Sequence, residues 1–231
     1  MGIYRQAGGA DPRWWAVSGF LPALSAVLFW PIRPETATYL AFGVLLYLIA
    51  RVRAGDWRWG WGLPLLTWIW ANFHASFMLA LVFIAIEAGL AWIPFTFGRI
   101  VNPPVAPALR VRWLIWLALS GIAGALTPHG LGFYQYAVTM STDNPMRHVI
   151  TEWASPDFHA AFFLIWLLMG VGGLIWSWQS SEPVPAWWVI YSVGLTYGFL
   201  DSVRWLPYAT VATPLWLAPL TRRQPRTIRW V

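Results

Sequence analysis

The polar segment from Thr127 to Ala160 is the part of the sequence whose residue types could do chemistry. It carries three of the four histidines, His129, His148 and His159, while the chain around it is apolar and rich in Trp. A polar stretch of this length cannot lie in hydrocarbon, because lipid satisfies neither its charges nor its backbone. We therefore expect the segment to lie outside the hydrocarbon or to line a water-filled cavity.

His148 and Glu152 have the spacing of neighbours on one helix face, with Arg147 beside them. Asn144-Pro145 is a suitable start for such a helix. On the outer surface this helix would present a base, an acid and a cation to a headgroup phosphate, so His148 and Glu152 are candidate catalytic residues and Arg147 is a candidate phosphate ligand. The alternative is an amphipathic helix whose polar face is only solvated.

His129 and His159 bracket the polar segment, and His129 is a further candidate for substrate binding. The chain has no Cys and no H-x-x-x-H or H-E-x-x-H spacing, the patterns that typically hold zinc on a helix. No residue is therefore assigned as a metal ligand and no cofactor is assigned, although a divalent metal ion stays open as an alternative.

Three more candidates lie within or between apolar runs. Asn72 and His74 fall at an inferred break between two membrane segments, and they either cap that break or contact substrate. In the short turn Asp-Ser-Val-Arg, Asp201 and Arg204 either pair with each other, or Arg204 binds a lipid-linked phosphate while Asp201, a candidate catalytic acid, orients it. Glu87 lies inside an apolar run, where an acid is a functional candidate unless it snorkels or stays protonated.

The composition is that of a polytopic membrane protein. Of the 231 residues, 58% are hydrophobic and 10% are charged, against about 25% charged residues in soluble proteins. The net charge of +6 comes from Arg, since the chain has no Lys. These arginines do not cluster on a soluble face, so nucleic acid is excluded as a partner. Without Cys, disulfides and thiolate nucleophiles are excluded as well.

We expect an all-α transmembrane bundle that forms a single integral membrane domain over residues 1–231, with about eight crossings, one of them a broken helix or hairpin. Pro64 weakens the third apolar run, and residues 60–93 form either one tilted helix with a half-helix or a hairpin that turns at Asn72-Phe73-His74. The Pro-rich loop from Phe97 to Leu109 is expected to be an irregular connector. The apolar runs are Trp14–Trp30, Thr36–Ala50, Gly60–Trp70, Ala75–Ile93, Trp113–Leu126, Ala161–Trp178, Ala186–Leu200 and Trp205–Leu220.

The arginines fall into alternate loops, which predicts the orientation of the bundle. With a cytoplasmic N-terminus, twelve of the 15 arginines lie on the cytoplasmic side, and the outer side holds Arg33, Arg147 and Arg204. Both termini are then cytoplasmic, and all four histidines face outward. So do Glu35, Glu152 and Asp201, so the candidate chemistry gathers on the outer face.

Trp is unusually frequent, with 20 residues of this type. Most of them lie near the ends of the apolar runs, where an amphipathic indole suits the headgroup region. We therefore expect the following residues to be interfacial anchors: Trp14, Trp15, Trp30, Trp57, Trp59, Trp61, Trp92, Trp113, Trp176, Trp178, Trp187, Trp188 and Trp205.

Five short stretches carry a resemblance to a known family. These stretches are IRPE (Ile32–Glu35), WANFHASFMLA (Trp70–Ala80), LTPHGLGFYQY (Leu126–Tyr136), ITEWASPDF (Ile150–Phe158) and SVRWLPYA (Ser202–Ala209). From about residue 32 onward, the chain resembles a family of bacterial polytopic membrane proteins with a GT-C-type glycosyltransferase architecture. In that family, patterns such as RPQ, WANxHGGF, NPYG, I-x-EW-x-SP-x-F and RHxP occur in the same order.

The resemblance implies a polyprenyl-phosphate-linked sugar as donor and a site at the outer face of the bacterial cytoplasmic (inner) membrane. The chain departs from the pattern where Thr127-Pro128-His129-Gly130 replaces Asn-Pro-Tyr-Gly, Ala75 replaces a Gly, and Trp205 replaces a His. Such enzymes also carry their key acid in the first outer loop of an N-terminal module, whereas Glu35 matches the RPQ region instead. The chain is therefore interpreted as the C-terminal part of a GT-C-like protein.

Two functions from different classes follow. In the first, the chain is a GT-C-like protein in the lipid membrane that handles a polyprenyl-phosphate-linked sugar, with Arg204 as the first phosphate ligand and Arg147 as the second. In the second, it is a non-catalytic integral membrane subunit that packs against a partner membrane chain or a second copy. We expect no sugar transfer by the isolated chain, because Glu152, Asp157 and Asp201 do not match the position of the family's acid.

Overall fold

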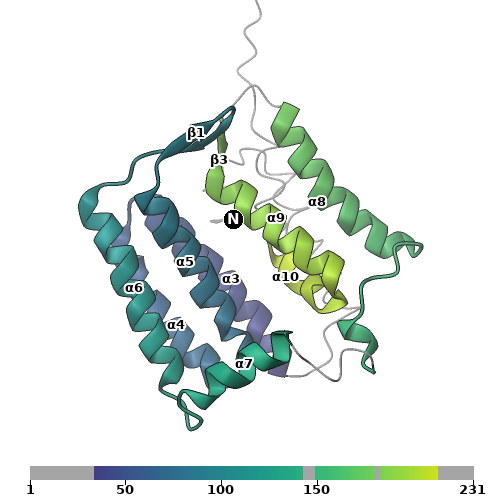
Figure 1. Ribbon diagram of the computed structural model, residues 1–231, viewed down its shortest axis with the longest axis horizontal. Coiled ribbons are helices and arrows are strands. Elements are labelled where there is room, and N and C mark those ends of the chain that lie inside the picture. Colours follow the sequence, from purple (N-terminus) through teal and green to yellow (C-terminus); the bar gives the residue numbers. More distant parts are fainter. Residues whose placement is uncertain (1–33, 143–148, 180–182, 213–231) are drawn as a thin grey trace, which may run out of the picture.

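The computed structural model describes residues 34–142, 149–179 and 183–212, and these residues are mostly helical (Figure 1). Four single 3-10 turns lie between the described helices: η1 (Trp57–Trp61), η2 (Ala75–Phe77), η4 (Thr151–Trp153) and η5 (Val203–Trp205). The helices are α3 (Pro34–Arg53), α4 (Gly62–Ala71), α5 (Met78–Trp92), α6 (Pro107–Ala125), α7 (Gly132–Thr142), α8 (Ala161–Gln179), α9 (Ala186–Asp201) and α10 (Leu206–Val211).

Three helices in the described part are long and apolar enough to cross a membrane, namely Glu35–Arg53, Ala75–Trp92 and Pro107–Ala125. This agrees with the membrane class that the composition predicts. The first predicted run, Trp14–Trp30, lies outside the described residues, and the total of eight crossings remains a prediction.

The expected break at Asn72-Phe73-His74 is present. Helix α4 ends at Ala71, and η2 begins at Ala75 and leads directly into α5. Asn72 closes α4, because its side-chain amide donates to the carbonyl oxygen of Trp68 at 2.8 Å. Helix α6 then packs against both α4 and α5.

A small three-stranded sheet was not predicted, and the expectation of an all-α fold is wrong in this respect. Strands β1 (Phe95–Phe97) and β2 (Ile100–Asn102) are antiparallel, and β2 pairs in parallel with β3 (Val184–Pro185). The expected irregular connector therefore begins as a hairpin. Aromatic and β-branched residues favour these strands, and Gly98 makes the turn with a φ of 57°.

The helices run between two ends of the bundle (Figure 1). We call the end that holds the sheet the arginine end, since the chain segments there carry Arg53, Arg58, Arg99, Arg110 and Arg112. Helix α7 lies at the opposite end. The arginine-rich connections from α3 to α4 and from α5 to α6 therefore lie at one end of the structure.

The core of the bundle holds aromatic rings from helices that are distant in sequence. Phe42 of α3 makes edge contacts with Phe83 of α5 and Tyr208 of α10, each with ring centroids 5.3 Å apart. Two of the predicted interfacial anchors also lie in the interior, since Trp113 is 3% and Trp188 is 2% exposed. These two indoles face neighbouring helices and not the headgroup region.

Candidate functional site

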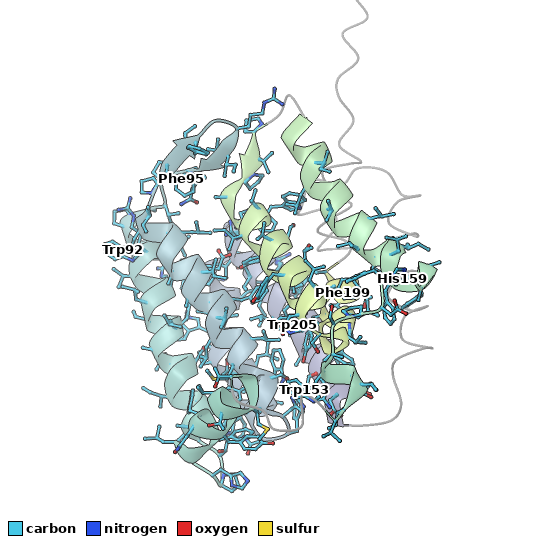
Figure 2. The ribbon with its side chains drawn as sticks, turned by 45° about the vertical axis from the view of Figure 1, so that its right-hand side comes forward. Trp92, Phe95, Trp153, His159, Phe199 and Trp205 are labelled. Carbon is cyan, nitrogen blue, oxygen red and sulfur yellow. The ribbon has the colours of Figure 1, made fainter. Side chains whose placement is uncertain are left out.

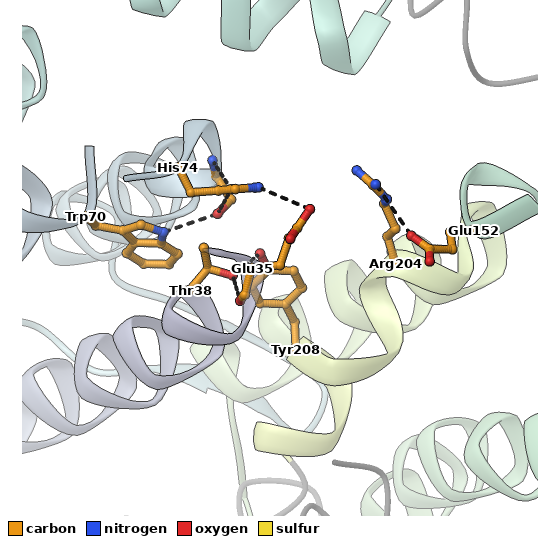
Figure 3. A network of polar contacts seen from close by, with 8 residues as sticks. Glu35, Thr38, Trp70, His74, Glu152, Arg204 and Tyr208 are labelled. Carbon is orange, nitrogen blue, oxygen red and sulfur yellow. Dashed lines mark hydrogen bonds and ion pairs between the residues drawn. The ribbon is translucent and has the colours of Figure 1, made fainter. Parts of the chain in front are cut away.

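Residues from four of the five stretches that carry the resemblance lie close together (Figure 3), and the elements that hold them meet at the end opposite the sheet (Figure 1). Glu35 lies in the first turn of α3, His74 precedes η2, Glu152 lies in η4 and Arg204 lies in η5. Nε2 of His74 is 4.0 Å from Oε1 of Glu35, and Nη2 of Arg204 is 3.4 Å from Oε2 of Glu152. We call these four residues the Glu35–Arg204 cluster.

Local hydrogen bonds fix the ring of His74. Its Nδ1 accepts the backbone N–H of Ser76 at 3.1 Å and lies 2.7 Å from the Ser76 hydroxyl oxygen. That hydroxyl oxygen in turn accepts the indole N–H of Trp70 at 3.1 Å. Because Nδ1 is an acceptor, the proton of the neutral ring lies on Nε2, the nitrogen that faces Glu35.

The surroundings of His74 favour its neutral form. Burial lowers the pKa of His74 below its ordinary value, and the positive charge of Arg204 lowers it further, whereas the carboxylate of Glu35 raises it. Burial is the largest of these effects. At neutral pH the ring is thus an uncharged N–H donor that points toward the carboxylate.

Arg204 is held by two turns that are fastened together. The Val203 N–H donates to the carbonyl oxygen of Ala154 at 3.0 Å, and the Ser202 hydroxyl donates to the carbonyl oxygen of Glu152 at 2.9 Å. The Arg204 guanidinium carbon lies 4.4 Å from the ring centroid of Trp153. η4 and η5 therefore act as one unit that places the guanidinium at this end of the bundle.

The ion pair between Arg204 and Glu152 is loose and open to solvent. The two side chains are 32% and 44% exposed, and their contact is 3.4 Å long. An exposed pair of this kind contributes about 0 to 1 kcal/mol. A guanidinium has five N–H donors, so within the described part of the chain an incoming anion would compete with one weak ion-pair contact.

A hydroxyl pair lies below Glu35. The Thr38 hydroxyl donates to the Glu35 carbonyl oxygen at 2.6 Å and lies 3.1 Å from the Tyr208 hydroxyl. The sequence patterns did not indicate Thr38, Ser76 or Tyr208 as candidate site residues, and they gave Glu35 no catalytic or binding role. Glu35 and Tyr208 do belong to the IRPE and SVRWLPYA stretches, and that membership was the signal that could have identified them.

The remaining predicted site residues have different outcomes. Asn72 caps α4, and His74 both caps η2 and faces Glu35. Asp201 is the last residue of α9, and the ion pair recorded for Arg204 is with Glu152 and not with Asp201. His129 is exposed at the turn before α7, and its ring centroid lies 5.9 Å from that of Phe133.

The predicted helix that would carry both His148 and Glu152 is wrong. Ile150 is extended, with φ −96° and ψ 115°, and η4 begins only at Thr151. The backbone between positions 148 and 152 is therefore not a continuous helix, and the i, i+4 argument fails. Arg147 and His148 themselves lie outside the described residues.

Glu87 is neither a snorkelling nor a lone protonated acid. Its side chain is 3% exposed, and it pairs with Arg53, whose Nη2 lies 2.6 Å from Oε1 and 2.5 Å from Oε2. The Tyr191 hydroxyl also donates to this carboxylate. The group joins α3, α5 and α9 near the arginine end, and its chemistry is that of a buried ion pair.

The histidines do not form a metal site in the part of the chain that the structure describes. No group of three His, Asp or Glu side chains that could hold an ion occurs there. The backbone N–H of His159 donates to the side chain of Asp157 at 3.0 Å, just before α8. This residue and His129 therefore belong to separate local environments.

Comparison of the chain with protein-family models, with curated proteins and with solved structures finds no match. The likeness to GT-C-type proteins therefore rests on the five stretches quoted above. Four of those stretches supply side chains to the Glu35–Arg204 cluster, and the fifth reaches the same region. Phe133 from the fifth stretch stacks on Phe77 of η2, with centroids 5.4 Å apart and planes at 23°.

Proposed function

We propose that this chain is a glycosyltransferase-related membrane protein that binds a polyprenyl-phosphate-linked sugar at the Glu35–Arg204 cluster. The observation that carries the proposal is the convergence of Glu35, His74, Glu152 and Arg204 at one end of a bundle with three helices apolar enough to span a membrane. A lipid-linked sugar phosphate needs such a place, where its chain can remain in lipid while its headgroup meets polar side chains.

Each side chain of the cluster has a role in this proposal. Arg204 binds the phosphate, because a guanidinium matches phosphate oxygens in two-point contacts and Trp153 already restricts its position. Neutral His74 offers its Nε2–H to a phosphate or sugar oxygen. Glu35 and Glu152 are the carboxylates that could accept a proton from an acceptor hydroxyl.

Binding can be tested with a polyprenyl phosphate and the matching unphosphorylated polyprenol, using the purified full chain in detergent. We expect the phosphate form to bind more tightly. A charge-assisted contact contributes roughly 1.5–3 kcal/mol, so Arg204→Gln should weaken binding about tenfold to a hundredfold. Arg204→Lys should retain part of the affinity, because it keeps the charge and loses the two-point geometry.

Arg58→Gln is the matched control, since Arg58 is an exposed arginine outside the Glu35–Arg204 cluster. It should bind the polyprenyl phosphate as the unmodified chain does. Equal binding of the phosphate and the polyprenol, or an Arg204→Gln variant that is folded and binds normally, would remove the proposal. The non-catalytic membrane subunit would then be the better interpretation of the chain.

A further inference from the structure

Four arginines near the arginine end lie over indole rings. A guanidinium above an indole face is stabilised by the ring and keeps its in-plane N–H donors free to point outward. The distances from the guanidinium carbon to the ring centroid are 5.3 Å for Arg51 and Trp59, 4.7 Å for Arg53 and Trp187, 6.0 Å for Arg110 and Trp92, and 3.9 Å for Arg112 and Trp57.

Two of these four arginines have their charge compensated and two do not. Arg51 pairs with Asp56 at 2.7 Å, and Arg53 pairs with Glu87. Among the residues that the structure describes, no carboxylate lies within ion-pair distance of Arg110 or Arg112. Arg110 donates from Nε to the carbonyl oxygen of Val105 at 2.7 Å, a contact that leaves its charge uncompensated.

Apolar rings are exposed at Trp92, which lies beside Arg110, and on strand β1. Trp92 is 48% exposed, Phe95 is 38% exposed and Phe97 is 71% exposed. Figure 2 shows Trp92 and Phe95 on one flank, away from Trp153 and Trp205 at the opposite end. Exposed aromatic rings beside uncompensated cations are the pattern of a membrane interface, where rings enter the acyl boundary and cations meet phosphates.

We propose that Trp57, Trp92, Arg110 and Arg112 form a binding surface for the headgroups of anionic phospholipids. Arg110 and Arg112 begin α6, one of the three helices that are long and apolar enough to span a membrane. In this proposal their guanidinium groups meet the lipid phosphates. The uncompensated charge favours a lipid with a net negative headgroup over a zwitterionic one.

The test uses the purified full chain in neutral detergent, with phosphatidylglycerol as the anionic probe and phosphatidylcholine as the zwitterionic one. Retained lipid is measured by native mass spectrometry, and thermal unfolding is followed in parallel. The unmodified chain should prefer phosphatidylglycerol. The double variant Arg110→Gln with Arg112→Gln should lose about thirtyfold in affinity for it. The double Lys variant should keep most of that affinity, since it retains both charges.

Two further arms keep the result decisive. If the Gln variant does not fold, the lipid preference of the unmodified chain is titrated with salt, and it should weaken as the salt concentration rises because screening shortens the reach of the charges. Arg58→Gln, which removes an exposed charge outside this surface, should leave the preference intact. A preference that is unaffected by the double Gln substitution or by salt, or one that disappears in Arg58→Gln, would overturn the proposal.

Discussion

At the scale of single residues, the position of Arg204 depends on contacts between η4 and η5, two turns that lie far apart in the sequence. Arg204 was predicted either to pair with Asp201 or to bind phosphate, yet its recorded ion pair is with Glu152. The spacing of Asp201 and Arg204 favours a local contact, but η5 is joined to η4 by one backbone hydrogen bond and by a hydrogen bond from the Ser202 hydroxyl, which no local pattern predicts. The contact between η4 and η5 could therefore not be predicted from the sequence.

His74 should make the stability of the protein depend on pH. Burial lowers the pKa of His74 in the folded state, so the unfolded chain binds a proton at a higher pH than the folded chain does. Stability should therefore fall as the pH drops through the ordinary histidine pKa of about 6.5, and should level off below the lowered pKa. Thermal unfolding between about pH 5.5 and 7.5 would measure this loss.

The matched variant is His74→Asn, because Asn does not titrate and is a good N-cap. The other three histidines are present in both proteins, so the difference between the two pH profiles isolates His74. A shallower loss of stability at low pH is expected in the variant. Parallel profiles would show that His74 does not titrate differently on folding.

The buried pair of Arg53 and Glu87 makes a second prediction for single residues. Either Arg53→Gln or Glu87→Gln leaves one polar partner uncompensated, and loss of one member of a buried pair costs about 3–5 kcal/mol. Arg53→Gln should be the more harmful change, because it leaves the Glu87 carboxyl without its cation at 3% exposure, whereas the Arg53 side chain is 25% exposed and can reach solvent. The double variant should unfold at a higher temperature than Arg53→Gln alone. Additive losses in the double variant would contradict this coupling.

At the scale of elements, the apolar runs predicted the positions of the described helices well. The structure of the connections between them was predicted less well. The predicted runs Thr36–Ala50, Ala161–Trp178 and Ala186–Leu200 correspond to α3, α8 and α9 with small shifts at their ends. The sheet was missed because β3 has only two residues, Val184 and Pro185, and is recognisable only through its pairing with β2. The helix expected to hold both His148 and Glu152 is not present, since Ile150 is extended. Hydrogen bonds between η4 and η5 determine the backbone there, and not the local i, i+4 spacing.

Close packing between α9 and η5 should position Arg204. A Cβ at Gly198 would overlap the buried face of the Trp205 ring, whereas a Cβ at Gly194 of the same helix would meet nothing within 4 Å. Gly198→Ala should therefore destabilise the protein by about 1–3 kcal/mol, the typical cost of overpacking. It should also weaken polyprenyl-phosphate binding, since Arg204 is next to Trp205.

Gly194→Ala is the matched control for this change. It adds the same methyl group to the same helix and should leave stability unchanged or raise it slightly, since Ala is the better helix former. Thermal unfolding and lipid binding are measured on both variants. Equal behaviour of the two would show that the contact of Gly198 with Trp205 does not fix the position of η5.

At the scale of the whole molecule, the arginine-rich connections and the Glu35–Arg204 cluster lie at opposite ends of the bundle. The connections that carry Arg53, Arg58, Arg99, Arg110 and Arg112 gather at one end of the bundle, and the Glu35–Arg204 cluster lies at the other. The Arg count along the sequence could predict this because charged loops on opposite sides of a membrane follow different rules. The composition of the cluster was harder to predict, since its members come from four separate stretches.

The orientation of the bundle can be tested by single-cysteine labelling, which is clean because the chain has no Cys of its own. With both termini cytoplasmic, a Cys at Ser141 should react with an impermeant reagent added outside intact cells. A Cys at Thr227 should react only after the cells are opened. The reverse pattern would show that the arginine end faces outward and that the predicted orientation is wrong.

Finally, we expect that the isolated chain does not transfer sugar. Glycosyl transfer from a phosphate donor needs a base close to the acceptor hydroxyl and stabilisation of the departing phosphate. Arg204 meets the second need in the function proposed above. For the first, Glu35, Glu152, Asp157 and Asp201 are available among the described residues, and none matches the position from which the resembling family is expected to supply its acid. The purified chain should therefore bind a polyprenyl-phosphate sugar without turnover, measured as release of the polyprenyl phosphate. Turnover that is lost in Glu35→Gln or Glu152→Gln, while binding is retained, would contradict this and make the chain an enzyme.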